Sequence, residues 1–76
     1  MTQFDKIQFA ERLHALRTRY GWSQTLLARK AGINLANYNS LEHGRKAGVR
    51  ADTVMALATA LNVSTDYLLG LSAKER

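Results

Sequence analysis

The feature that most constrains the fold of this chain is the spacing of helix caps and glycines in residues 23–44. Ser23 is suited to begin a helix and Gly32 to end it, because serine accepts hydrogen bonds from free N–H groups and glycine takes left-handed conformations. Asn34 and Gly44 stand in the same positions around a second segment of similar length. Two short helices joined by a tight turn that contains glycine are predicted to form a helix-turn-helix.

The rest of the chain has the same helical character and predicts an all-α fold. Apolar residues recur at spacings of three or four before and after the helix-turn-helix, as in helices that bury one face. Five helices are expected, over about 5–20, 24–31, 35–43, 51–61 and 65–69. The first of them is expected to turn Phe9, Leu13, Leu16 and Tyr20 toward the core.

Chain length indicates one small domain. A chain of 76 residues buries only about 60% of its unfolded surface, which suits a single compact helical core. Because no proline, low-complexity tract or internal repeat marks a boundary, residues 1–76 are expected to form one domain with a core of about 5–70. The residues after the core, 71–76, are expected to fray. The start of the fourth helix is poorly defined, because Arg50 rather than serine or threonine precedes Ala51.

Composition excludes several classes of protein and of site. The chain has no cysteine for disulfides or thiolate metal sites, and His14 and His43 have no evident metal partners. No segment approaches the ~20 apolar residues of a membrane span, and the N-terminus lacks a signal-peptide pattern, so a cytoplasmic protein is expected. We see no nucleophile–base arrangement, paired carboxylates or phosphate-binding glycine loop, and therefore expect no enzyme, no cofactor and no metal.

Positive charge is concentrated around the helix-turn-helix. The formal net charge of the whole chain is +5. Residues 12–50 carry eight lysines and arginines against one acid, Glu42, whereas residues 51–76 carry two bases against three acids. A cationic surface of this kind is what binding to phosphate groups requires, although charge that serves only solubility would look similar.

A set of residues spread over the predicted core carries a resemblance to a known family. These residues are Leu16-Arg17, Gly21, Ser23-Gln24, Leu27-Ala28, Ala31-Gly32-Ile33, Tyr38, Leu41-Glu42, Gly44, Leu57-Ala58, Ala60-Leu61 and Val63-Ser64. At these spacings, over about residues 9–70, the chain resembles the phage Cro/repressor helix-turn-helix family, also called the XRE or lambda-repressor-like family. The resemblance implies a compact five-helix domain whose second and third helices form the helix-turn-helix and bind operator DNA, usually as a symmetric dimer. The loop of residues 45–50 departs from the family, because it lacks the proline that is common there.

The resemblance assigns the reading of DNA bases to the outer face of the third predicted helix. The positions concerned are Leu35, Ala36, Asn37 and Ser40. Leucine and alanine can contact thymine methyl groups, and asparagine can bind adenine through two hydrogen bonds. Because this helix has no arginine to read guanine, we expect the contacted positions to be rich in A·T pairs. Leu35 could instead pack on the preceding helix.

A second group of residues is expected to bind the DNA backbone and so to position the protein. The group consists of Ser23, Gln24, Asn34, Asn39, His43, Arg45 and Lys46. The resemblance implies that Gln24 donates to a phosphate, and free N–H groups in the first turn of a helix also favour anions there. Arg45 and Lys46 directly follow the base-reading helix and are the strongest phosphate-binding candidates in their loop. Gln24 and Asn39 could instead be solvated side chains.

The resemblance also implies an ion pair between Arg17 and Glu42, which would fix the base-reading helix to the first helix. Loss of one partner should be harmful, because it would leave a partly buried charge unpaired. The structural role of this pair is therefore favoured over a contact with DNA.

The apolar residues near the C-terminus exceed what so small a core needs. Val63, Tyr67 and Leu71 are therefore assigned to a homodimer interface. A dimer would place two base-reading helices about 34–36 Å apart, one turn of DNA. The same residues could instead fold back onto the first helix.

Together these observations predict a sequence-specific double-stranded DNA-binding transcriptional regulator that represses from a pseudo-palindromic operator as a homodimer. A restriction–modification controller, or an antitoxin that regulates its own operon, is an alternative built on the same domain. From a different class, a protein-interaction module would show no salt-sensitive DNA binding, and the cationic residues 12–50 argue against it. We expect neither a membrane nor a small-molecule ligand as a partner.

Overall fold

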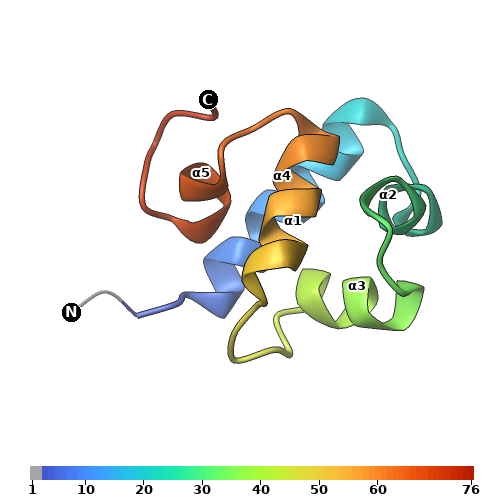
Figure 1. The fold of residues 1–76 in the computed structure, drawn as a ribbon, viewed down its shortest axis with the longest axis horizontal. Coiled ribbons are helices and arrows are strands. Elements are labelled where there is room, and N and C mark those ends of the chain that lie inside the picture. The colour runs from blue at the N-terminus through green and yellow to red at the C-terminus, as the bar shows by residue number, and fades with distance from the viewer. Residues whose placement is uncertain (1–2) are drawn as a thin grey trace.

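The computed structural model describes residues 3–76 and shows five helices within them (Figure 1). The helices are α1 (Lys6–Tyr20), α2 (Gln24–Ala31), α3 (Leu35–Glu42), α4 (Ala51–Leu61) and α5 (Thr65–Leu69). The all-α prediction is confirmed, and the helix ends agree with the expected ones to within one residue. No helix in the described part of the chain is long and apolar enough to cross a membrane.

Side-chain caps explain why four of the helices begin where they do. In each case a polar side chain accepts a hydrogen bond from a backbone N–H group of the first turn, and these caps are Asp5, Ser23, Asn34 and Ser64. The bonds satisfy N–H groups that have no partner inside the helix. α4 differs, because its N-cap Arg50 makes no such bond, and Asp52 places a negative charge in the first turn instead.

The turn between α2 and α3 depends on Gly32. Its φ of +70° lies in the left-handed region, and its N–H donates to the carbonyl oxygen of Arg29 at 3.1 Å. The next residue, Ile33, donates to the carbonyl oxygen of Ala28 at 2.9 Å, and its half-buried side chain packs against the core. These contacts fix the direction in which α3 leaves α2.

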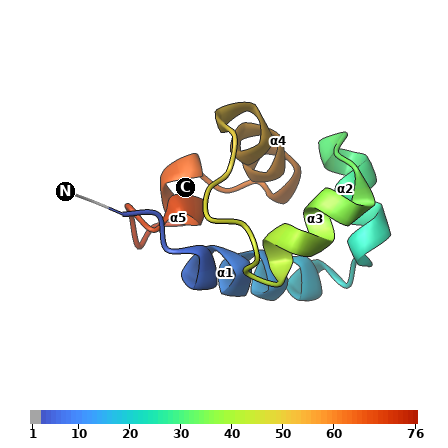
Figure 2. The same cartoon turned by 90° about the horizontal axis from the view of Figure 1, so that it is seen from below.

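A single core joins the five helices. Its largest fully buried side chains are Tyr38, Phe9, Leu13, Leu16, Leu27, Leu57, Leu61 and Leu68. α1 packs on α3 and α5, α2 packs on α3 and α4, and α4 packs on α5. Figure 2 shows α1 and α4 on opposite sides of this core, with α5 at one end and the α2–α3 pair at the other. α3 therefore lies at the edge of the molecule.

Tyr20 departs from the expected inward orientation, since it is 43% exposed. Its ring stacks on that of Trp22 with the centroids 4.4 Å apart, and its hydroxyl donates to the carbonyl oxygen of Leu61 at 2.9 Å. Because Tyr20 is the last residue of α1, its side chain covers the end of the core instead of entering it.

The residues after α5 lie against the domain, which contradicts the expectation that they fray. Arg12 of α1 donates to the carbonyl oxygens of Tyr67 and Ser72. Arg19, near the end of α1, makes two hydrogen bonds to Glu75, each 2.9 Å long. The C-terminal segment consequently curves around α5 (Figure 1).

Candidate DNA interface

α3 presents the expected base-reading residues outside the core. Only Tyr38 and Leu41 of this helix are fully buried. Of the four base-reading candidates, Leu35 and Ala36 are exposed, whereas Asn37 and Ser40 are half-buried. Leu35 is 44% exposed, so its apolar side chain is available for contact with a thymine methyl group.

Asn37 lies beside two cations that are distant from it in sequence. It lines a pocket of about 130 Å³ between α3, the following loop and the start of α4. Lys46, Arg50 and Thr53 line the same pocket. The sequence did not place Arg50 next to α3, because no local pattern reports how the loop returns along this helix.

In each of the two N-caps of the helix-turn-helix, one side-chain oxygen accepts a hydrogen bond from the backbone of its own helix. Ser23 Oγ accepts from the N–H of Leu26 at 3.0 Å, and Asn34 Oδ1 accepts from the N–H of Asn37 at 3.2 Å. The Ser23 hydroxyl hydrogen and the Asn34 amide nitrogen remain as donors of the type that binds phosphate oxygens.

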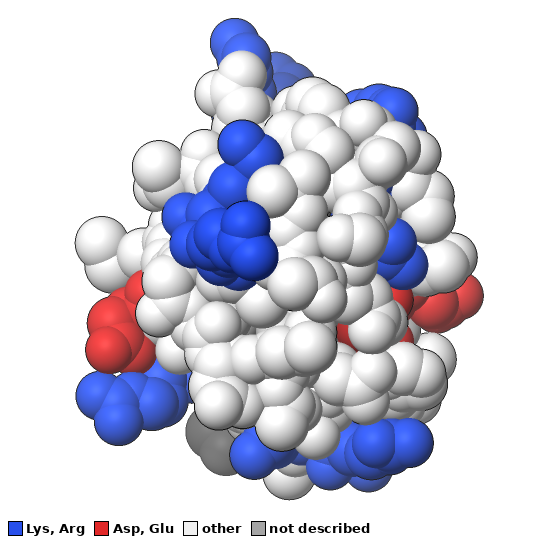
Figure 3. Space-filling view, turned by 90° about the vertical axis from the view of Figure 1, so that its right-hand side faces the viewer, with Lys and Arg blue, Asp and Glu red and all other residues white. Residues whose placement is uncertain are grey.

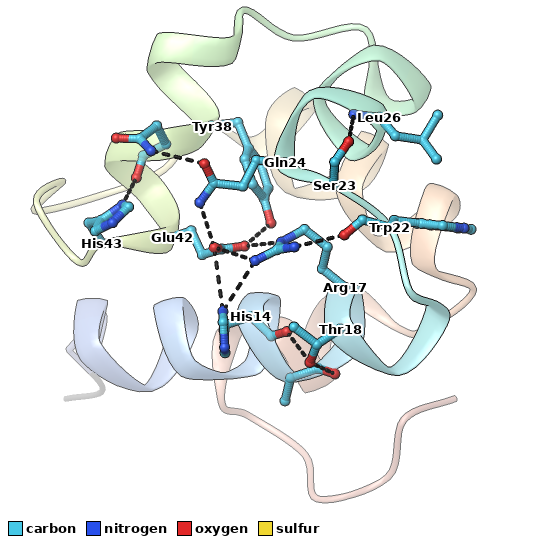
Figure 4. A network of polar contacts seen from close by, with 12 residues as sticks. His14, Arg17, Thr18, Trp22, Ser23, Gln24, Leu26, Tyr38, Glu42 and His43 are labelled. Carbon is cyan, nitrogen blue, oxygen red and sulfur yellow. Dashed lines mark hydrogen bonds and ion pairs between the residues drawn. The ribbon is translucent and has the colours of Figure 1, made fainter.

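Arg17 and Glu42, the expected ion pair, join α1 to the end of α3. Arg17 Nε lies 2.7 Å from Glu42 Oε1, and Arg17 Nη2 lies 3.0 Å from Oε2. The side chains are only 13% and 4% exposed, respectively. Arg17 Nη1 also donates to the carbonyl oxygen of Trp22 at 2.7 Å, so the guanidinium holds α1, α3 and the α1–α2 turn together (Figure 4).

Glu42 receives further hydrogen bonds that stabilise its charge. The Tyr38 hydroxyl and Gln24 Nε2 both donate to its carboxylate, and His14 Nδ1 lies 3.5 Å from Oε2. Burial by itself would raise the pKa of Glu42, but the hydrogen bonds from Arg17, Tyr38 and Gln24 outweigh it and lower that pKa from 4.5 to about 2. Burial and the bond to Glu42 raise the pKa of the Tyr38 hydroxyl.

Gln24, expected to donate to a phosphate, has both ends of its amide bound within the protein. Nε2 donates to Glu42 Oε2 at 2.7 Å, and Oε1 accepts from Asn39 Nδ2 at 3.0 Å. Figure 4 shows Gln24 directed from α2 toward Glu42. His43 Nδ1 lies 2.7 Å from the carbonyl oxygen of Asn39. The helical sequence pattern did not reveal the Gln24–Asn39 contact, because it depends on how α2 and α3 cross.

Basic side chains surround this region. Arg29, Lys30, Arg45 and Lys46 are exposed and form no salt bridge within residues 3–76. Arg50 is also exposed, but it pairs with Asp52 at 3.1 Å. Lys30 Nζ lies 4.8 Å from the centre of the Trp22 ring. Figure 3 shows several separate groups of Lys and Arg on the α2 side of the molecule, with Asp and Glu visible at the left and right of the same face.

The residues assigned to a dimer interface are only partly exposed. Val63 and Tyr67 are half-buried and pack against the core, and the Arg12 guanidinium lies 4.0 Å from the centre of the Tyr67 ring. Leu71 is 55% exposed. Leu71 is therefore the member of this set with most surface left for a partner.

Comparison with known proteins decides the family. A family model described as helix-turn-helix matches residues 13–68, which include α2, α3 and α4 completely. The chain belongs to this helix-turn-helix family. The match covers both helices of the motif and most of the core on which they rest.

One relative by sequence and two solved structures are similar to this helix-turn-helix protein. The SPbeta prophage-derived uncharacterized HTH-type transcriptional regulator YonR of Bacillus subtilis (strain 168) is 43% identical over 61 residues, which are 80% of this chain and 56% of that protein. The chain thus spans little more than half the length of this relative. The restriction-modification controller protein C.AhdI from Aeromonas hydrophila has a TM-score of 0.78 and 34% identity, over 84% of this chain and 96% of its own. The P22 c2 repressor, solved with synthetic operator 9T, has a TM-score of 0.76 and 26% identity over the same shares.

Proposed function

We propose that this protein is a sequence-specific double-stranded DNA-binding regulator of transcription, whose α3 enters the major groove. The observation that carries the proposal is the exposed face of α3, with Leu35 and Ala36 outside the core. Arg45 and Lys46 follow the end of this helix, and neither forms a salt bridge within residues 3–76. A helix of this kind, held at the edge of a compact domain, is the element that reads base edges in helix-turn-helix proteins. Family membership and the operator-bound P22 c2 repressor support the same function.

In this proposal the protein acts as a repressor and binds a pseudo-palindromic operator as a homodimer in the cytoplasm. Leu35 and Ala36 contact thymine methyl groups, and Asn37 and Ser40 contact base edges beside them. The backbone set is Ser23, Gln24, Asn34, Asn39, His43, Arg45 and Lys46. The leucine at position 71 supplies exposed apolar surface for the second copy.

Control of a restriction–modification operon is a second candidate function. The observation that favours it is the likeness to C.AhdI, which is 34% identical and matched over 96% of its length. The DNA-binding mechanism would be the same, and only the regulated genes would differ. A binding site recovered upstream of a methyltransferase or endonuclease gene would favour this candidate over the first.

Selection from a pool of random duplex DNA at two salt concentrations tests the proposal. We expect an inverted repeat whose half-sites lie about one DNA turn apart. Sequence-independent binding that disappears at higher salt would leave only the electrostatic contribution and overturn the proposal. Absence of DNA binding at both salt concentrations would instead favour a protein-interaction module.

A matched pair of variants identifies the surface that binds. Lys46→Ala should reduce the slope of log affinity against log salt by about 0.9, because one phosphate contact is lost. Lys74→Ala is the control, since Lys74 is equally a surface lysine but lies in the C-terminal segment beyond α5. Equal slopes for Lys46→Ala and the unmodified protein would contradict the placement of the 45–50 loop on DNA.

A further inference from the structure

The hydrogen bond between Asn39 and Gln24 links two residues that were both expected to bind phosphate independently. Asn39 Nδ2 donates to Gln24 Oε1 at 3.0 Å, and Gln24 Nε2 donates to Glu42 Oε2 at 2.7 Å. Asn39 and Gln24 are half-buried. The three side chains form one chain of hydrogen bonds across the contact between α2 and α3.

The charge of Glu42 sets the direction of the hydrogen bonds along this chain, and the bond from Asn39 holds the other end of the Gln24 amide. A carboxylate can only accept hydrogen bonds, so Gln24 must present its NH₂ group to it. The oxygen of Gln24 then faces away from Glu42, and Asn39 must in turn present its own NH₂ group. Each donor in the chain thus points toward Glu42, an arrangement in which successive hydrogen bonds strengthen one another.

The orientation of Gln24 has a consequence for an approaching phosphate. A primary amide carries two N–H donors, and Glu42 takes one of those on Nε2. Within residues 3–76 the second has no acceptor, and Gln24 is the first residue of α2, where free backbone N–H groups also favour an anion. An amide turned the other way would offer the phosphate an oxygen, which repels it.

We propose that Asn39 is a positioning residue that holds the Gln24 amide in the orientation that donates to a DNA phosphate. The proposal rests on the DNA-binding function proposed above. Asn39 acts through Gln24 and needs no contact with DNA of its own. Fixing the amide before binding lowers the conformational entropy lost in the complex.

A double-mutant cycle on affinity for DNA tests this proposal. The probe is the duplex recovered by selection, and the variants are Asn39→Ala, Gln24→Ala and the double variant. We expect Asn39→Ala to weaken binding about fivefold in the unmodified protein and less than about twofold in the Gln24→Ala background. Equal losses in both backgrounds would mean that Asn39 contacts DNA directly, and no loss in either would mean that it does not act in binding. Each result overturns the proposal.

Two controls separate positioning from general disruption. Asn37→Ala removes an amide on the same helix that has no side-chain bond to Gln24, so its effect should add to that of Gln24→Ala. Arg45 Nη1 also lies 3.5 Å from Asn39 Oδ1, so Asn39 could act by positioning Arg45 instead of Gln24. The salt dependence of binding distinguishes the two roles. It should be unchanged by Asn39→Ala if Asn39 acts through Gln24, whereas a slope smaller by about 0.9 would mean that Arg45 has lost its phosphate contact and would contradict the proposal.

The remaining outcomes are also decisive. Asn39→Ser removes the same amide donor and serves as a second variant should Asn39→Ala melt at a lower temperature than the unmodified protein. If the unmodified protein binds no duplex at all, the proposed function fails and this inference fails with it. If it binds a specific duplex and the cycle is additive, only the inference fails.

Discussion

Glu42 is the residue at which three helices meet through side-chain hydrogen bonds. Its carboxylate receives donors from Arg17 of α1, Gln24 of α2 and Tyr38 of α3, and it is 4% exposed. A buried ion pair is weak evidence for stability in itself, because desolvation offsets the attraction, but loss of one partner leaves an uncompensated charge. The pair therefore fixes the position of α3, and removing or neutralising one partner should destabilise the fold.

The contribution of Glu42 to stability should be lost in acid. The pKa of Glu42 is about 2 in the folded protein, below its ordinary value of 4.5, so its contribution to stability is complete above pH 4.5 and is lost as the pH falls toward 2. The difference corresponds to a loss of about 3 kcal/mol in the free energy of unfolding. Urea unfolding at several pH values between 6 and 2.5 measures the larger part of it, because the loss is complete only below the folded pKa.

Two variants test whether Glu42 causes the loss of stability in acid. Glu42→Gln should be less stable at pH 6 and should show much less change with acid, because the titrating group is gone. Glu75→Gln is the control, since its carboxylate pairs with Arg19 on the surface and contributes little. An unchanged acid response in Glu42→Gln would refute this assignment.

At the scale of the helices, the turn between α2 and α3 sets the orientation of the base-reading helix. Gly32 has a φ of +70°, and a methyl group added there would meet open space. Glycine is therefore needed at this position for its backbone conformation and not because a larger side chain would clash. Gly32→Ala should therefore cost about 1–2 kcal/mol in the free energy of unfolding. Gly48→Ala is a matched control, because that glycine is equally open and has no positive φ; its expected effect is neutral or slightly stabilising. Urea denaturation measures the free energy of unfolding of both variants. Equal values would contradict a conformational requirement for glycine at position 32.

The helices were also the part of the structure that the sequence predicted best. Helix caps and terminal glycines act over three or four residues, so Ser23, Asn34 and Gly32 could be interpreted locally. Contacts between helices could not, because they depend on crossing geometry that no short pattern encodes. The Gln24–Asn39 bond and the position of Arg50 beside Asn37 are of this kind.

At the scale of the whole molecule, the candidate DNA interface and the exposed leucine lie toward opposite ends. Figure 1 shows α5 and α3 separated along the longest axis, which measures 34 Å. Two helices that read successive major grooves stand about 34–36 Å apart, so each lies about 17–18 Å from the two-fold axis. A molecule of this length that pairs through the α5 end is long enough to hold α3 at that distance from the two-fold axis.

Leu71→Ser tests whether that end pairs. Leu71 is 55% exposed, and burial of its side chain against a second copy would contribute about 1.5–3 kcal/mol, so the variant should weaken self-association tenfold or more. Met55→Ser is the control, because Met55 is 60% exposed on α4 and is not assigned to the interface. Sedimentation equilibrium over a range of concentrations distinguishes the 8.5 kDa monomer from the dimer. If Leu71→Ser and the unmodified protein dimerise equally, the copies meet elsewhere, and the spacing between the two α3 helices must be set by another surface.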